Sequence, residues 1–199
     1  LEGDALGVLE QAESVGDLPL RLGLNPWVVP SRAAELPSIL AMNGRSGRRW
    51  RIEGVKFFLD GTVDGGTAWL EEADCCGEGR GTPWGDAEAF AEVFEQAYLA
   101  GVNTATHAIG DRAVRVVCEL VEALERKHGP RGAHRVEHIE TASDAVVGLF
   151  AGRRIAASMQ PLHATRFARA GHSDTWSRRL GGERARNGFR CGDLREVGA

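Results

Sequence analysis

Five short apolar runs alternate along the chain with segments in which apolar residues recur at helical spacing. Regular alternation of this kind predicts a parallel sheet with crossover helices, which is an α/β fold. Two architectures fit the pattern alone, a doubly wound open sheet and a partial (β/α)8 barrel. No glycine-rich dinucleotide or phosphate-loop motif follows any run. The runs predict strands at residues 19–24, 54–59, 102–107, 134–139 and 154–158.

Residues that favour helix ends delimit the segments between these runs. Ser31 is a candidate N-cap of a short helix, and Asp86 is a candidate N-cap of a longer helix that ends at Gly101. A second long amphipathic helix is predicted from Gly110 to His128, and Ser143 is predicted to cap a helix that runs to about Ala151. Residues 61–85 are rich in Gly, Thr and acidic residues and lack periodicity. A connection of that length is often functional.

Composition excludes several classes of protein. The chain is 43% hydrophobic and 26% charged, which is typical of a globular protein, and its net charge of -4 argues against a nucleic-acid partner. No apolar run approaches the ~20 residues that a membrane-spanning helix needs. The four cysteines form no CxxC pattern, so neither a disulfide framework nor a zinc ribbon is predicted. A reducing, cytoplasmic setting is the expectation.

The two ends of the chain suggest an internal piece of a longer protein. The sequence begins at Leu1 within a helical pattern and stops at Ala199, directly after a helix end at Gly198. We therefore expect the native N-terminus, with any signal peptide on it, to lie outside this sequence.

Polar residues with metal-binding chemistry fall near the carboxyl ends of three predicted strands. These are Lys56, His107 and His138. Carboxyl ends of parallel strands gather on one face, where active sites form, and imidazole is a favoured ligand for zinc. Alternation places Lys56 on the same side of its strand as Phe58 and Asp60, opposite residues 55, 57 and 59.

Structural explanations also fit these residues when each is taken alone. A single histidine at a strand end is often a hydrogen-bonded structural group. Lys56 can extend its ammonium to solvent from a strand end. The acidic residues that follow can line a solvated loop; they are Asp60, Asp64, Glu71 and Glu72.

Four motifs in register change this balance. The segments VKFFLDGTVDGGTA, THAIGDRAV, HRVEHIE and ASMQPLHA, in this order, resemble the amidohydrolase superfamily. The branch they resemble most is that of the YtcJ-like proteins, which contains N-substituted formamide deformylases. The resemblance covers nearly the whole chain and implies a distorted (β/α)8 barrel of the TIM type. On that basis residues 1–199 are a fragment of a single barrel domain, truncated at both ends, with about strands three to seven present.

The resemblance also implies a metal centre at the mouth of the barrel. It assigns Lys56, His107 and His138 as ligands of one or two divalent ions, with zinc as the expected metal. Lys56 is implied to be carbamylated by carbon dioxide, so that its oxygens can bridge two metals. The family's HxH pair and strand-eight aspartate are missing from this sequence. The aspartate, a general base, is expected beyond Ala199, and the chain alone is expected not to turn over efficiently.

The implied activity is hydrolysis of amide- or formamide-type C–N bonds in small molecules by a metal-activated water. His163, in QPLHA, is a candidate substrate contact or a loop histidine. Alternation predicts that Glu137 faces away from His138 and is structural, whereas the role of Glu140 is open. Alternative functions are another amidohydrolase, such as an N-acyl amino acid deacylase or a deaminase, and a non-catalytic metal-binding remnant. The oligomeric state is not predicted.

Overall fold

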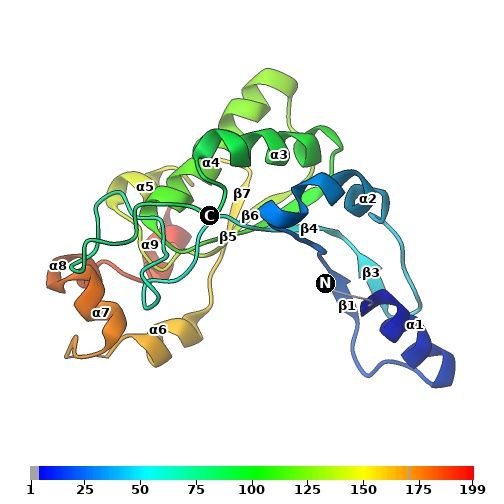
Figure 1. The fold of residues 1–199 in the computed structure, drawn as a ribbon, viewed down its shortest axis with the longest axis horizontal. Coiled ribbons are helices and arrows are strands. Elements are labelled where there is room, and N and C mark those ends of the chain that lie inside the picture. Colours follow the sequence, from blue (N-terminus) through cyan, green and yellow to red (C-terminus); the bar gives the residue numbers. More distant parts are fainter. Residues whose placement is uncertain (1–4, 170) are drawn as a thin grey trace.

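The structure of the chain is a computed structural model that describes residues 5–169 and 171–199. A parallel five-stranded sheet in the order β2-β4-β5-β6-β7 forms its centre, and β1 pairs with β3 in a separate two-stranded parallel sheet (Figure 1). This confirms the predicted α/β class. The strands are β1 (Leu22–Leu24), β2 (Trp27–Val28), β3 (Trp50–Ile52), β4 (Gly54–Phe58), β5 (Asn103–Ala108), β6 (His134–His138) and β7 (Ile155–Ser158).

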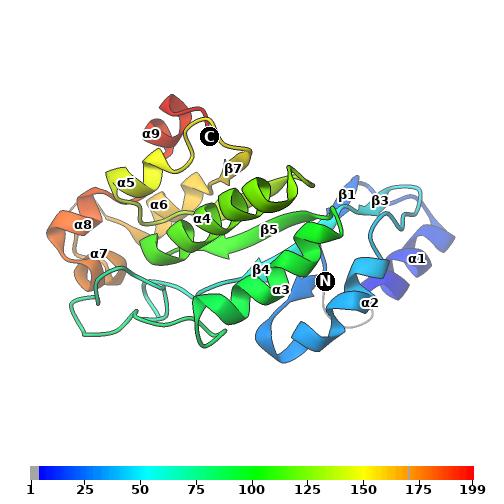
Figure 2. The same ribbon diagram turned by 90° about the horizontal axis from the view of Figure 1, so that it is seen from above.

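The two longest helices, α3 and α4, lie along one face of the sheet (Figure 2). Asp86 caps α3 by accepting a hydrogen bond from the backbone N–H of Ala89 at 2.8 Å, as predicted, and Ser143 caps α5 in the same way. No helix within residues 5–169 and 171–199 meets the length and apolarity that a membrane span requires. The helices are α1 (Ala5–Val15), the 3-10 helix η1 (Pro30–Glu35), α2 (Leu36–Ala41), α3 (Ala87–Leu99), α4 (Asp111–His128), α5 (Asp144–Gly148), α6 (Pro161–Phe167), α7 (Thr175–Leu180), α8 (Gly182–Arg186) and α9 (Cys191–Glu196).

Strand β4 divides its side chains between two environments. Val55, Phe57 and Leu59 are at most 1% exposed and join the core, where the ring of Phe57 lies 5.7 Å from that of Phe90 on α3. Lys56 and Phe58 are only partly buried and lie on the other side, as alternation predicts. The sheet therefore has one face sealed by α3 and α4 and one face that carries polar groups.

The first predicted strand is placed wrongly. Residues 22–24 belong to the small sheet, and β2 takes the position beside β4, with Trp27 opposite Lys56. Two residues carry no detectable periodicity, so the sequence pattern could not reveal β2. Strand β3 begins at the end of the segment 43–51, whose polar, glycine-rich sequence predicts a loop rather than a strand.

Two predicted helix ends are also wrong. Ser31 does not cap a helix: η1 begins after Val29, with Pro30 in its first turn and no side-chain cap. Proline is favoured there because its fixed φ suits a first helical position. Helix α5 ends at Gly148, short of the predicted Ala151.

Candidate active site

Lys56, His107 and His138 come together near the carboxyl ends of β4, β5 and β6. Strand register sets Phe58 beside His107 and Ala108 beside His138. The imidazole rings of His107 and His138 lie 4.6 Å apart between centroids. The site thus lies at the end of the sheet where active sites of parallel α/β folds form.

His138 reaches this position through an unusual backbone. Its register partner Ala108 is fully buried in the core, so simple alternation would direct His138 there too. The φ angles of His138 and the following Ile139 are instead 77° and 49°. Non-glycine residues in this region cost on the order of 1–3 kcal/mol each, and such strain concentrates at functional sites. The turn brings the His138 ring against His107.

Glu137 lies on the same face of the sheet as Lys56, although alternation predicts the opposite face. Its carboxylate forms an ion pair with the ammonium of Lys56 and accepts a hydrogen bond from Arg135 Nε at 3.0 Å. The prediction that Glu137 faces away is therefore wrong. It assumed that His138 obeys alternation, whereas the positive φ of His138 breaks it. The register of Glu137 with His107 is the signal that places it correctly.

The ammonium of Lys56 occupies a mostly buried position, with 12% of its side chain exposed. Burial, and then the charge of Arg135, lower the pKa of Lys56 to about 8. The carboxylate of Glu137 opposes this change because it favours the charged ammonium. A lysine in this setting has a neutral amine accessible near physiological pH.

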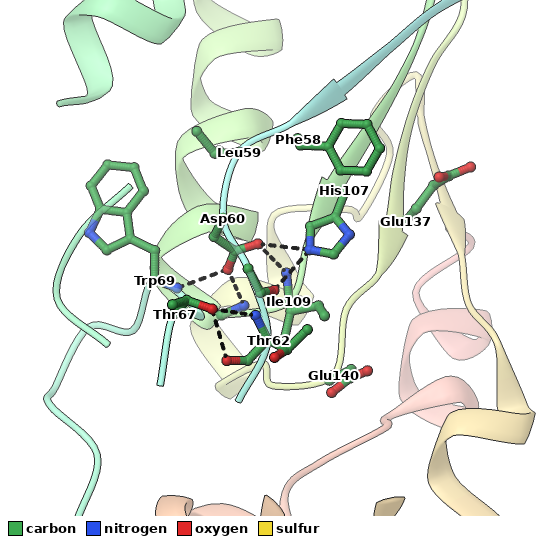
Figure 3. A network of polar contacts seen from close by, with 12 residues as sticks. Phe58, Leu59, Asp60, Thr62, Thr67, Trp69, His107, Ile109, Glu137 and Glu140 are labelled. Carbon is green, nitrogen blue, oxygen red and sulfur yellow. Dashed lines mark hydrogen bonds and ion pairs between the residues drawn. The ribbon is translucent and has the colours of Figure 1, made fainter. Parts of the chain in front are cut away.

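His107 is oriented by the loop that follows β4 (Figure 3). Its Nε2 donates to the carbonyl of Gly61 at 2.9 Å and lies 3.4 Å from Asp60 Oδ1. Burial is the main cause that lowers the pKa of His107. The neutral ring therefore holds its proton on Nε2, which leaves Nδ1 as the nitrogen with a lone pair.

Asp60 holds three chain segments together. Its fully buried carboxyl accepts hydrogen bonds from the backbone N–H groups of Trp69 at 2.8 Å, Ile109 at 3.0 Å and Gly110 at 2.8 Å (Figure 3). Burial raises the pKa of Asp60 to about 7, against the opposing effect of these bonds. A solvated-loop role for Asp60 is therefore wrong. Its place two residues after the end of β4 was the only local signal.

A carboxylate–histidine pair borders the two central histidines. His163, on α6, stacks almost parallel to His138 at 5.3 Å between centroids, and its Nδ1 lies 2.9 Å from Glu140 Oε1. The other oxygen of Glu140 accepts a hydrogen bond from Trp176 Nε1 at 2.8 Å. Burial raises the pKa of Glu140, and its two hydrogen bonds oppose that effect. The structure thus places His163 beside the site and makes Glu140 part of it.

The donors present fit part of a metal-binding site. Burial, followed by the charges of His107 and Lys56, lowers the pKa of His138 to about 4, so its ring is neutral at neutral pH. His138 Nδ1 is buried and has no hydrogen-bond partner within the described chain, as expected of a ligand atom. Across residues 5–169 and 171–199, no three His, Cys, Asp or Glu side chains form a complete ligand group. Two neutral imidazoles beside a lysine supply about half of a zinc ligand set.

Comparisons with known proteins agree with this geometry. Residues 3–199 match the family model described as "Amidohydrolase family". Two crystal structures of uncharacterized metal-dependent hydrolases, from Pyrococcus furiosus and Pyrococcus horikoshii OT3, are 28% and 27% identical, with TM-scores of 0.74 and 0.69. Each covers 98% of this chain, which spans 39% and 38% of theirs. The fold therefore resembles part of the barrel of metal-dependent hydrolases, as predicted.

A plant protein gives a second sequence match. "Protein LONG AFTER FAR-RED 3" of Arabidopsis thaliana is 31% identical over 136 residues, which make up 67% of this chain and 22% of that protein. The chain thus spans about a fifth of this relative's length.

Proposed function

Because this chain belongs to the amidohydrolase family, we propose that it forms part of a metal-dependent hydrolase that cleaves amide- or formamide-type C–N bonds, other than peptide bonds, in small molecules. The observation that carries this proposal is the convergence of His107 and His138 at 4.6 Å, with a buried, unpartnered Nδ1 on His138. The YtcJ-like branch and a single barrel domain belong to the same proposal. A reducing, cytoplasmic setting is also part of this proposal.

His107 and His138 would hold the metal, with zinc as the first choice, and Lys56 would lie beside them as a carbamate. When bound, such an ion lowers the pKa of a water molecule and polarises the carbonyl group of the substrate. The protein's own contribution to His107 is orientation. The Gly61 carbonyl and Asp60 hold its Nε2, and partners of this kind fix the ring and raise the basicity of the ligand nitrogen.

Glu137 has a defined place in carbamate formation on Lys56. The neutral amine adds to carbon dioxide through a new N–C bond and loses one proton. The Glu137 carboxylate contacts Lys56 Nζ and can accept that proton. The ion pair between the two residues must open as the carbamate forms, because the charged ammonium has no lone pair.

Metal content tests the proposal. The chain contains two lysines, Lys56 and Lys127, and Lys127 forms an exposed ion pair with Glu95 on the helical side. Lys56→Ala and His138→Ala should each lower the zinc retained by the full-length protein after dialysis by at least about tenfold, whereas Lys127→Ala should retain the wild-type content. Plasma mass spectrometry gives the zinc-to-protein ratio. Wild-type zinc content in both site variants would refute the assignment.

The carbamate has a separate readout. Protein equilibrated with ¹³C-labelled bicarbonate and zinc should give one carbamate carbon resonance, which Lys56→Ala removes and Lys127→Ala preserves. The same signal in the Lys56→Ala protein would refute carbamylation of Lys56, while leaving a simpler metal site intact.

A further inference from the structure

Glu140 is a buried carboxylate whose two oxygens contact side chains from two different helices. Only 3% of the residue is exposed. Oε1 lies 2.9 Å from His163 Nδ1 on α6, and Oε2 lies 2.8 Å from the indole nitrogen of Trp176 on α7. Its backbone is held as well, because its carbonyl accepts a hydrogen bond from Phe189 N at 3.0 Å. The carboxylate is therefore fixed in place before any ligand binds.

The donor and acceptor properties of these groups define the tautomer of His163. An indole N–H only donates, so Glu140 Oε2 is an acceptor. An ionised carboxylate only accepts, so Oε1 requires a proton on His163 Nδ1. In the neutral ring this leaves the lone pair on Nε2.

The remaining nitrogen of His163 is the one left for a ligand. The ring lies nearly parallel to that of His138, with 6° between their planes, and Phe167 packs against it at 5.1 Å. Its side chain is 28% exposed, and no hydrogen bond to Nε2 occurs within the described part of the chain. Nε2 is thus the polar atom of this ring without a partner in the described chain, while Glu140 and the neighbouring rings hold the ring beside the site.

We propose that Glu140 is a positioning residue, which holds His163 in the Nδ1–H tautomer so that Nε2 hydrogen-bonds the substrate beside the metal centre. Trp176 assists by engaging the second oxygen of Glu140. The substrate contact rests on the proposed hydrolase function, whereas the tautomer assignment does not depend on it.

The tautomer is measured by ¹⁵N NMR of histidine-labelled protein at about pH 8. Wild-type His163 should show a protonated Nδ1 and an unprotonated Nε2; His163→Gln assigns the signals. In Glu140→Gln, the amide oxygen must accept from Trp176, so the amide nitrogen donates to Nδ1. The tautomer should then reverse, with the proton on Nε2.

Two further variants keep the measurement decisive if packing changes. Trp176→Phe retains the aromatic packing and the carboxylate, so the wild-type tautomer should persist. In Glu140→Gln/Trp176→Phe nothing fixes the amide, which can donate to Nδ1 or accept from Nδ1–H, so the uniform reversal should be lost and the wild-type tautomer should reappear in part. Glu95→Gln is the matched control, because Glu95 contacts His128 Nε2 at 2.9 Å on the helical side, and it should leave the His163 signals unchanged. An unchanged tautomer in folded Glu140→Gln would overturn the proposal.

The substrate contact is tested in the full-length zinc protein with 4-nitroformanilide as probe. Glu140→Gln should lower kcat by about 10- to 100-fold at unchanged zinc content and with KM within about twofold. A reversed tautomer with unchanged kcat would overturn the role of His163 at the substrate. Absence of activity in the wild type would instead count against the proposed function and leave the tautomer result standing.

Discussion

Replacing Asp60 by asparagine tests how burial and hydrogen bonding are balanced in the carboxyl group that joins β4 to the loops after it. Asp60 accepts three backbone N–H groups, two of them on Oδ2 and one on Oδ1. Asparagine retains one acceptor oxygen. Its better orientation keeps the oxygen at the Oδ2 position and leaves the N–H of Ile109 facing an amide nitrogen. One buried, unsatisfied N–H costs about 1–3 kcal/mol, so Asp60→Asn should destabilise the fold by that amount near pH 5.

The size of this loss should depend on pH. The pKa of Asp60 is raised from 3.8 to about 7 in the fold. A group with a raised pKa contributes stability that is fully present below its unfolded pKa and is lost as pH rises through its folded pKa. Asparagine does not titrate. Between pH 5 and pH 7 the free energy of unfolding of the wild type, relative to that of Asp60→Asn, should therefore fall by about 1.4 kcal/mol per pH unit, or about 3 kcal/mol in all.

Urea unfolding at about pH 5 and about pH 8.5 measures the two free-energy differences, provided that wild type and variant share one m-value. Asp86→Asn is a suitable control at either pH. Asp86 is an exposed N-cap, and asparagine caps helices about as well, so the free energy of unfolding should change by only a few tenths of a kcal/mol. If the stability of the wild type relative to Asp60→Asn instead rises with pH, the reasoning is refuted. The three N–H donors would then lower the pKa of Asp60 by more than burial raises it.

Three further predictions concern packing and protonation elsewhere. Gly110→Ala would place a methyl group against the backbone of Trp69 and should lower the free energy of unfolding by about 1–3 kcal/mol, measured in urea. The control Gly148→Ala places its methyl group in open space and should be neutral or stabilising. Equal effects of the two substitutions would contradict the contact at Gly110. Burial raises the pKa of Cys118 to about 12, so its thiol should resist alkylation at neutral pH until the chain unfolds, as mass spectrometry of the labelled protein would show. The lowered pKa of His138, about 4, gives a stability contribution that is present above about pH 6.5 and lost as pH falls through 4. After allowance for partial exposure it amounts to about 1 kcal/mol, and a thermal melt series should show a shallower acid decline in metal-free His138→Gln.

Local patterns predicted those features that depend on neighbours in sequence. The alternation in β4 predicted that Phe57 faces the core and Lys56 the opposite side, and both hold. Asp86 and Ser143 cap helices because a short polar side chain can reach the free N–H groups of the next turn. The nearness of the strand ends that carry His107 and His138 follows from the parallel sheet, whereas the contact of their rings needs the turn at His138.

Other features depend on contacts that no local pattern records. The two-residue strand β2 exists because it pairs with β4, and Glu137 faces Lys56 because a strained turn at His138 interrupts the alternation.

The sequence by itself determined the alternation of strands and helices from β4 to β7, the buried face of β4 and the residue types available for chemistry, because side-chain periodicity reports local burial. Only the tertiary structure decided which of those residues work together. Asp60 accepts hydrogen bonds from backbone N–H groups 49 and 50 positions further along the chain, and Glu140 accepts one from Trp176, 36 positions further along. A buried carboxylate is stable only where such donors converge, and that convergence is set by packing of the whole chain.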